Sequence, residues 1–279
     1  MIIIDGKKVS ENIKQNIKRE IDVITKEGKQ VGLAVIIIGD DPASKIYVRN
    51  KIKSCEETGI RSYHYALPND ISQKEVLALI DALNADPKIN GILVQLPIPK
   101  HLNKEQILGA IDVKKDVDGF SAYQCGKTFL GEKSLVSCTP QGILALLKAY
   151  NIEISGKNAV VIGRSNIVGK PTALLLLQEN ATVTTCHSKT TNLSFYTKNA
   201  DIIVVAVGKA KFLTEDMVKE GVVIIDAGIN RLDNGKICGD VDFENVANKA
   251  SYITPVPGGV GPMTVTMLLK NTLDSYKNG

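Results

Sequence analysis

The chain has 279 residues, of which 44% are hydrophobic and 23% are charged, a composition that is ordinary for globular proteins and argues against disorder. The formal net charge of +4 is mild and scattered, which argues against a nucleic-acid-binding protein. Apolar runs such as Leu33–Ile38 are far shorter than the roughly 20 residues that span a bilayer. We therefore expect a cytoplasmic protein that has no nucleic-acid or membrane partner.

The cysteines and histidines are dispersed along the chain. There are five cysteines and three histidines, and no two cysteines form a C-x-x-C pair. Such an odd, unpatterned set is typical of reduced thiols in the cytosol. We expect no metal site.

Two kinds of segment alternate from the N-terminus to the C-terminus. Short β-branched runs predict parallel strands that are covered on both faces: Leu33–Ile38, Gly91–Val94, Ala159–Ile162, Ala181–Cys186, Ile202–Val207 and Val222–Ile225. Longer amphipathic segments predict helices: Val9–Lys26, Ser44–Thr58, Ser72–Asn84, Pro140–Tyr150, Lys170–Glu179 and Met263–Tyr276. The alternation predicts an α/β fold with crossover helices.

The segment Tyr123–Ser137 is polar, bears glycine and has weak periodicity, which predicts a domain junction. We expect two lobes with a cleft between them. The first is an N-terminal α/β catalytic domain made of residues 1–137 and 264–279, with the closing helix packing back on it. The second is a Rossmann-like dinucleotide-binding domain made of residues 138–263.

A candidate catalytic face lies on the helix after the first predicted strand. Asp41 can cap this helix, and Pro42 suits its first turn. Ser44, Tyr47 and Lys51 are spaced i, i+3 and i+7, so they share one face of the helix. Ligands favour the C-terminal end of a parallel strand, where this face would lie. The alternative is an ordinary surface lysine beside a half-buried tyrosine.

Two further groups join this candidate site. Gln95 directly follows the strand Gly91–Val94 and would emerge at the same sheet edge as Lys51. Asp116 and Asp118 lie in a turn before the junction. A buried amide and a turn aspartate are the alternatives for Gln95 and for the two acids.

A glycine turn between a strand and a helix begins at Gly163. Small residues let the backbone approach a pyrophosphate, and the helix N-terminus offers free N–H groups. The pattern departs from the strict G-x-G-x-x-G, because Ser165 replaces the second glycine and Gly169 falls one position late. A tight turn without a ligand therefore stays open.

The end of the following strand indicates which dinucleotide is bound. NAD sites usually carry an acid there, which bonds the ribose hydroxyl. The segment Cys186–Thr190 has no acid but has hydroxyls and positive charge, and Arg164 is also available. This favours NADP over NAD, unless an acid such as Glu179 folds in or the loop is only solvated.

The segment Pro255–Pro262 contains three prolines and three glycines. Such a loop is stiff and can approach a ligand closely. Because it lies between a predicted strand and a predicted helix, we expect a ligand loop rather than a linker.

Taken together, these motifs closely resemble the bifunctional methylenetetrahydrofolate dehydrogenase/cyclohydrolase family, nearly end to end. The residues that carry the resemblance are Pro42–Ser44, Tyr47, Val48, Lys51, Lys53, Cys55, Gly59, Gln95–Pro99, Asp116–Phe120, Gly163–Ser165, Val168, Gly169, Pro171 and Pro257–Thr264. Each motif alone is weak, whereas the set in this order and spacing is highly specific.

The resemblance implies a homodimer that oxidises 5,10-methylenetetrahydrofolate with NADP and hydrolyses the methenyl product to 10-formyltetrahydrofolate. It implies that Lys51 is the main catalytic residue, that Tyr47 stacks on the folate, that Gln95 hydrogen-bonds Lys51 and that Asp118 holds the pterin. The implied substrate-binding residues are Ser44, Tyr47, Pro255, Pro257, Gly258, Gly259 and Val260. The implied cofactor-binding residues are Gly163, Arg164, Ser165, Ser188 and Ile229.

The charge of Lys51 matters because hydride loss leaves a cation on the substrate, which a protonated lysine would oppose. We expect Lys51 to be partly neutral or to move its proton, with Arg49 or Lys53 biasing it if either is near. Three alternatives stay open: a dehydrogenase-only relative, a shikimate-type NADP-dependent dehydrogenase and a non-catalytic NADP-binding module.

Overall fold

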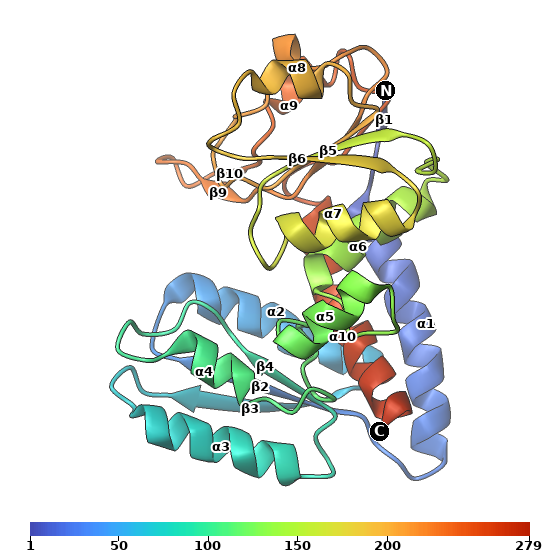
Figure 1. The fold of residues 1–279 in the computed structure, drawn as a ribbon. Coiled ribbons are helices and arrows are strands. Elements are labelled where there is room, and N and C mark those ends of the chain that lie inside the picture. Colours follow the sequence, from blue (N-terminus) through green and yellow to red (C-terminus); the bar gives the residue numbers. More distant parts are fainter. The chain divides into compact units, whose positions relative to one another are not determined.

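A computed structural model describes residues 1–279, apart from the side chain of Ala43. The chain divides into two compact units. We call residues 12–136 and 265–279 the three-stranded unit, and residues 1–11 and 137–264 the six-stranded unit, after their parallel sheets (Figure 1). The predicted α/β fold with parallel sheets in two parts is confirmed.

This division differs from the predicted one at the N-terminus. Strand β1 (Ile2–Ile3) pairs in parallel with β11 (Tyr252–Ile253). The backbone N–H of Asp5 donates to the hydroxyl of Tyr150 at 2.7 Å. The first eleven residues therefore belong to the six-stranded unit, and helix α1 (Gly6–Lys26) begins there and ends in the three-stranded unit.

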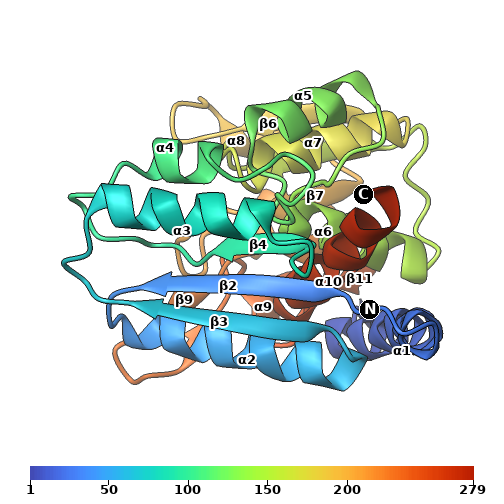
Figure 2. The ribbon, with the colours of Figure 1, turned by 90° about the horizontal axis from the view of Figure 1, so that it is seen from below.

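The sheet of the three-stranded unit has the order β3-β2-β4, with every neighbour parallel. Its strands are β2 (Gly32–Ile38), β3 (Arg61–Leu67) and β4 (Gly91–Val94). All of β2 is buried, as a central strand covered on both faces should be. Figure 2 shows α3 (Gln73–Ala85) and α4 (Lys104–Gly109) over one face and α2 (Pro42–Thr58) against the other.

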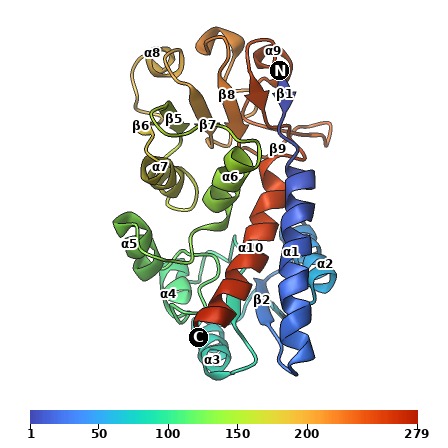
Figure 3. The ribbon, with the colours of Figure 1, turned by 90° about the vertical axis from the view of Figure 1, so that its right-hand side faces the viewer.

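Local signals fix the helices of this unit. Asp41 caps α2 by accepting from the backbone N–H of Ser44 at 2.7 Å, and Gly59 ends the helix with a φ of 83°. Helix α10 (Val260–Asn278) lies beside α1 along the three-stranded unit (Figure 3), where Lys277 forms an ion pair with Glu20. Within the described residues, no helix is both long and apolar enough to cross a membrane.

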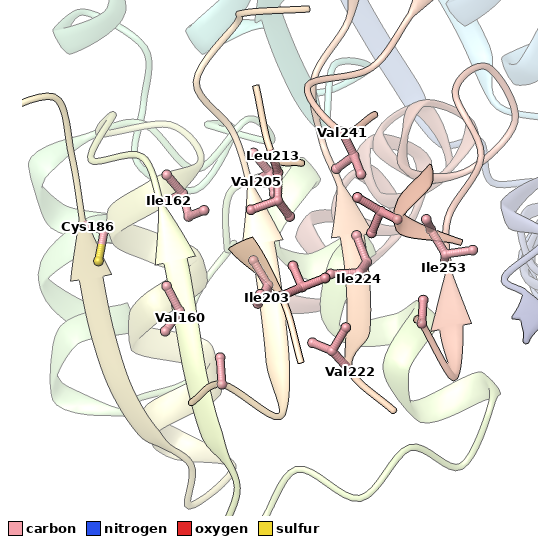
Figure 4. Packing of buried hydrophobic residues seen from close by; sticks show 14 residues of the cluster. Val160, Ile162, Cys186, Ile203, Val205, Leu213, Val222, Ile224, Val241 and Ile253 are labelled. Atoms are coloured by element: carbon pink, nitrogen blue, oxygen red, sulfur yellow. The ribbon is translucent and has the colours of Figure 1, made fainter. Parts of the chain in front are cut away.

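The sheet of the six-stranded unit has the order β1-β11-β8-β7-β5-β6, and all its neighbours are parallel. Its other strands are β5 (Asn158–Ile162), β6 (Thr182–Cys186), β7 (Ile202–Val205) and β8 (Val223–Asp226). Figure 4 shows buried side chains such as Val160, Ile203 and Ile224 packed on one face. The surrounding elements are α6 (Cys138–Ala149), α7 (Gly169–Gln178), α8 (Leu193–Thr197), η1 (Glu215–Met217), α9 (Phe243–Val246) and the hairpin of β9 (Asn230–Arg231) with β10 (Ile237–Cys238).

Several predicted elements need correction. Strand β3 was not predicted, and helix α5 (Ala122–Leu130) occupies part of the predicted junction. Helix α10 begins at Val260 rather than Met263, because Pro262 falls in the first turn, where no N–H is needed. Strand β7 ends two residues early, since the N–H of Val207 donates to a carboxylate instead of a neighbouring strand.

Candidate active site

The sheet of the three-stranded unit brings Lys51 and Gln95 together. Helix α2 leaves the C-terminal end of β2, and Gln95 directly follows β4, the parallel neighbour of β2. The chain passes from β2 to β3 on one side and returns to β4 on the other, which makes this edge a topological switch point. The Nζ of Lys51 donates to Oε1 of Gln95 at 2.9 Å, as predicted.

Hydrogen bonds hold both the backbone and the side-chain amide of Gln95. Its backbone N–H donates to the carbonyl of Ile36 at 2.8 Å, and this bond extends the pairing of β4 with β2. Its Nε2 donates to the carbonyl of Leu96 at 2.7 Å. With Nε2 engaged, Oε1 is the atom that faces Lys51, so the amide fixes where the amine lies.

Asp118 brings a negative charge to the same place. Burial raises the pKa of Asp118 to about 6, Lys51 lowers it and Asp116 raises it further. The two ionisable groups of Lys51 and Asp118 are therefore electrostatically coupled. The structure thus groups Lys51, Gln95 and Asp118, three of the four residues that were predicted to be catalytic.

Asp116 has a structural role, unlike Asp118. Its buried carboxylate accepts from the N–H groups of Gly119 at 3.1 Å, Phe120 at 3.3 Å and Ser121 at 2.7 Å. Its backbone forms a parallel bridge with Ile92 of β4. Asp116 is therefore a turn residue that ties the Asp118 segment to the sheet.

The other predicted residues of α2 differ in exposure. Ser44 is buried, whereas Tyr47 is 42% exposed, so its ring is accessible to a flat ligand. Arg49 and Lys53 are exposed and lie two positions from Lys51, so they face other directions. The condition on which either cation would bias Lys51, that it lies near, is therefore not met on this helix.

Cys55 lies below Lys51 on the same helix. Burial raises the pKa of its thiol to about 12, although Lys51 opposes the shift. A thiol with so high a pKa is unreactive at neutral pH. Cys55 is therefore a packing residue of α2.

The six-stranded unit has its own switch point, between β5 and β7, because β5 is flanked by β6 on one side and by β7 on the other. Gly163, Ser188 and Ile229 follow β5, β6 and β8 at the same sheet edge. Arg164 and Ser165 are exposed there, and Ile229 is 50% exposed. The predicted cofactor residues therefore share one edge.

The turn after β5 fits a dinucleotide. Gly163 has a φ of 135°, a region that favours glycine. A Cβ atom on Gly169 would lie 2.3 Å from the carbonyl oxygen of Gly163, so only glycine allows α7 to approach the strand so closely. The Oγ of Ser165 accepts from the N–H groups of Val168 at 3.1 Å and Gly169 at 3.3 Å. The serine that departs from the glycine pattern thus binds two N–H groups where α7 begins.

The turn after β6 lacks an acid. The N–H of His187 donates to Oγ1 of Thr190 at 2.9 Å, which closes a turn with Ser188 exposed. Glu179 follows α7 and precedes β6, at the opposite end of that strand, and it pairs with Lys148 at 2.6 Å. Glu179 therefore does not fold into the turn after β6.

The loop before α10 is a tight turn. Gly258 has a φ of 110°, and a Cβ atom on Gly259 would lie 2.6 Å from the carbonyl oxygen of Pro255. The first turn of α1 packs against it, because a Cβ atom on Gly6 would lie 1.8 Å from the carbonyl oxygen of Gly259. Val260, predicted as part of the loop, instead begins the helix.

Two buried acids of the six-stranded unit were not predicted. Asp226 ends β8, and burial raises its pKa to about 6, although N–H donors from Gly228, Asp240 and Val241 oppose the shift. Asp240 is fully buried. The sequence offers one hint, since each of these aspartates lies close to a glycine. The groups that hydrogen-bond to the aspartates are brought together only by the tertiary structure.

Two family models match the chain. The tetrahydrofolate dehydrogenase/cyclohydrolase catalytic domain matches residues 4–118, and the NAD(P)-binding domain of the same family matches residues 137–279. A bifunctional protein FolD from Campylobacter hominis is 58% identical over 278 residues, which covers 100% of this chain and 98% of the relative.

Solved structures agree with these matches. The bifunctional FolD enzyme of Campylobacter jejuni, a methylenetetrahydrofolate dehydrogenase/cyclohydrolase, has a TM-score of 0.98 and 54% identity, and covers 100% of this chain and 99% of its own. The Trypanosoma brucei dehydrogenase-cyclohydrolase, solved with NADP cofactor and an inhibitor, has a TM-score of 0.95 and 36% identity, and covers 100% and 98%.

Proposed function

The chain belongs to the tetrahydrofolate dehydrogenase/cyclohydrolase family, and we propose that it uses NADP and that Lys51 carries the chemistry. It is a bifunctional methylenetetrahydrofolate dehydrogenase and methenyltetrahydrofolate cyclohydrolase of one-carbon folate metabolism. The observation that carries the assignment to Lys51 is its hydrogen bond to Gln95 at the switch point, beside Asp118. Membership of this family decides against a shikimate-type enzyme.

NADP is the proposed cofactor for two reasons. The turn after β6 has no acid to accept a ribose hydroxyl, while Arg164 and Ser188 are exposed at the same edge. The related Trypanosoma brucei enzyme was solved with NADP. Gly163, Arg164, Ser165, Ser188 and Ile229 would hold the cofactor, whose nicotinamide would accept a hydride from the methylene carbon of the folate.

Lys51 is the proposed base of the hydrolysis. In its neutral form, Nζ takes a proton from the water that attacks the methenyl carbon. Gln95 holds Nζ in position through Oε1. The carboxylate of Asp118 then stabilises the ammonium that forms, because opposite charges attract strongly in a half-buried site.

The remaining assignments follow the resemblance and the exposure of each residue. Tyr47 stacks on the folate with its accessible ring, and Asp118 accepts from the N–H groups of the pterin. The other proposed folate contacts are Ser44, Pro255, Pro257, Gly258, Gly259 and Val260. The proposal includes a homodimer in the cytoplasm, which the resemblance supports.

A spectrophotometric assay tests this proposal. Purified protein is given methylenetetrahydrofolate with either NADP or NAD, and the decay of methenyltetrahydrofolate is then followed without a cofactor. Methenyl formation with NADP, together with accelerated decay, supports both activities and the cofactor. Formation without accelerated decay indicates a dehydrogenase-only relative, and NADP binding without either activity indicates a non-catalytic module.

A further inference from the structure

Asp240 gathers backbone donors from the loop after β7. Its Oδ2 accepts from the N–H groups of Val207 at 2.6 Å and Gly208 at 2.9 Å, and its Oδ1 accepts from the N–H of Lys209 at 2.8 Å. The same Oδ1 accepts from Nδ2 of Asn230 at 2.9 Å, on β9 beyond the end of β8. One carboxylate therefore fixes the loops that follow two adjacent strands.

A second carboxylate holds Asp240 itself. Oδ1 of Asp226 accepts from the N–H of Asp240 at 3.0 Å and from that of Gly228 at 2.9 Å, and Oδ2 accepts from the N–H of Val241 at 2.9 Å. Because Asp226 is the last residue of β8, the sheet sets the position of Asp240.

The packing around this pair leaves no room for a shift. A Cβ atom on Gly228 would lie 2.2 Å from Cγ of Asp240, and one on Gly239 would lie 1.9 Å from Oδ2 of Asp226. Both carboxylates are buried, with Asp240 0% and Asp226 3% exposed. Burying a carboxylate is costly unless several donors satisfy it, and a fully satisfied network specifies one backbone conformation.

The loops that Asp240 holds, after β7 and β8, lie at the sheet edge where a dinucleotide binds. The pyrophosphate of a dinucleotide lies at the turn between the first strand and its helix, and the adenosine ribose lies at the end of the next strand. In this chain the pyrophosphate position is the β5–α7 turn, and the adenosine position is the end of β6. The nicotinamide half would therefore lie at the ends of β7 and β8. The segment 207–209 and Asn230 belong to those two ends.

We propose that Asp240 is a positioning residue for the nicotinamide half of the dinucleotide, acting through the segment 207–209 and Asn230. The inference rests on the proposed use of NADP. It assigns Asp240 no contact with the folate, so its effect on the two activities differs. The dehydrogenase needs the dinucleotide, whereas the cyclohydrolase reaction does not.

The test is Asp240→Asn, with Asp242→Asn as the matched control. Asp242 undergoes the same chemical change nearby, but its carboxylate pairs with Lys211 at 3.2 Å, outside the segment 207–209 that Asp240 holds. We expect the KM for NADP to rise roughly tenfold in Asp240→Asn, because a buried donor loses its charged acceptor. We expect methenyl hydrolysis without cofactor to stay within about twofold, and the control to match the wild type in both assays.

A second variant keeps the test decisive if Asp240→Asn does not fold. Asn230→Ala removes one donor from Asp240 and leaves its carboxylate intact, and it should raise the KM for NADP roughly threefold. A folded variant with an unchanged KM, or an equal loss of both activities, overturns the inference. NADPH binding, measured by titrating NADPH into each protein and recording its fluorescence, separates this outcome from failure of the proposed function. An inactive wild type refutes that function, whereas weaker NADPH binding by Asp240→Asn still supports the role of Asp240.

Discussion

Asp118 and Lys51 come from different elements of the three-stranded unit, and the positive charge of Lys51 lowers the pKa of the Asp118 carboxyl. Burial raises the pKa of Asp118 to about 6 even though Lys51 opposes the shift. Asp118 precedes α5, while Lys51 lies on α2 after the central strand. The carboxyl of Asp118 is therefore ionised above about pH 6, and its negative charge is lost as the carboxyl is protonated.

The pH dependence of folate binding should follow this carboxyl. As the pH falls through about 6, Asp118 gains a proton and loses acceptor capacity, so the KM for methenyltetrahydrofolate should rise. The measurement is the cofactor-free hydrolysis at a series of pH values. Asp118→Asn should raise the KM at every pH and remove the inflection. A wild-type KM that is flat across this range would contradict the assignment.

The same titration affects stability in the opposite sense. The pKa of Asp118 in the folded protein, about 6, lies above its ordinary value of 3.8, so the folded state binds this proton more tightly than the unfolded chain does. Ionised Asp118 therefore costs stability above about pH 6, and the cost disappears as the pH falls toward 3.8. Acid weakens folate binding but does not unfold the protein through this residue.

Gly169→Ala should separate the two activities. Its Cβ atom would lie 2.3 Å from the carbonyl oxygen of Gly163 and 2.8 Å from the backbone nitrogen of Arg164, so the turn after β5 must move. We expect the KM for NADP to rise at least roughly tenfold, because the backbone loses its alignment with the pyrophosphate. Cofactor-free hydrolysis should stay close to the wild-type rate.

A helical glycine with open space provides the control for this variant. Gly126 lies within α5, and a Cβ atom there would meet no atom within 4 Å. Gly126→Ala should leave both activities unchanged and raise the free energy of unfolding by about 0.5–1 kcal/mol, measured by urea denaturation. If Gly169→Ala behaves like Gly126→Ala, the turn after β5 does not bind the cofactor.

Arg164 should determine the preference for NADP. The turn after β6 has no carboxylate that would favour NAD, so the guanidinium of Arg164 is the charged group assigned to the 2′-phosphate. Arg164→Ala should raise the KM for NADP by roughly tenfold to a hundredfold and change the KM for NAD little. Equal increases for the two dinucleotides would show that Arg164 does not distinguish them.

The sequence predicts the buried strands of the fold better than its edge strand and its terminal strand. Strands β2 and β4 are continuous apolar runs that are buried along their whole length, so hydrophobicity alone reveals them. Strand β3 is partly exposed at the edge of its sheet, and its mixed composition hides it. The pairing of β1 with β11 joins opposite ends of the chain, and no local pattern encodes such a contact.

The candidate site shows the same division. Helical spacing and strand ends place Lys51 and Gln95 at one sheet edge, and the family resemblance implied the hydrogen bond between them. The contacts of Asp240 could not be predicted, because three of its donors are backbone N–H groups of a distant loop, which almost any residue type would supply. Arg49 and Lys53 were expected to influence the protonation of Lys51 only if they lay near it. Helix geometry turns both side chains away from Lys51.

The central claim is that Lys51 is the base of the hydrolysis, and the most direct measurement compares Lys51→Met with Lys53→Met, an exposed lysine on another face of α2. The rate of methenyltetrahydrofolate decay is measured without cofactor, and NADPH binding confirms that each variant is folded. Lys51→Met should lose on the order of 100-fold or more of the hydrolysis rate, while it binds NADPH normally and Lys53→Met stays active. Full hydrolysis by Lys51→Met would contradict the account.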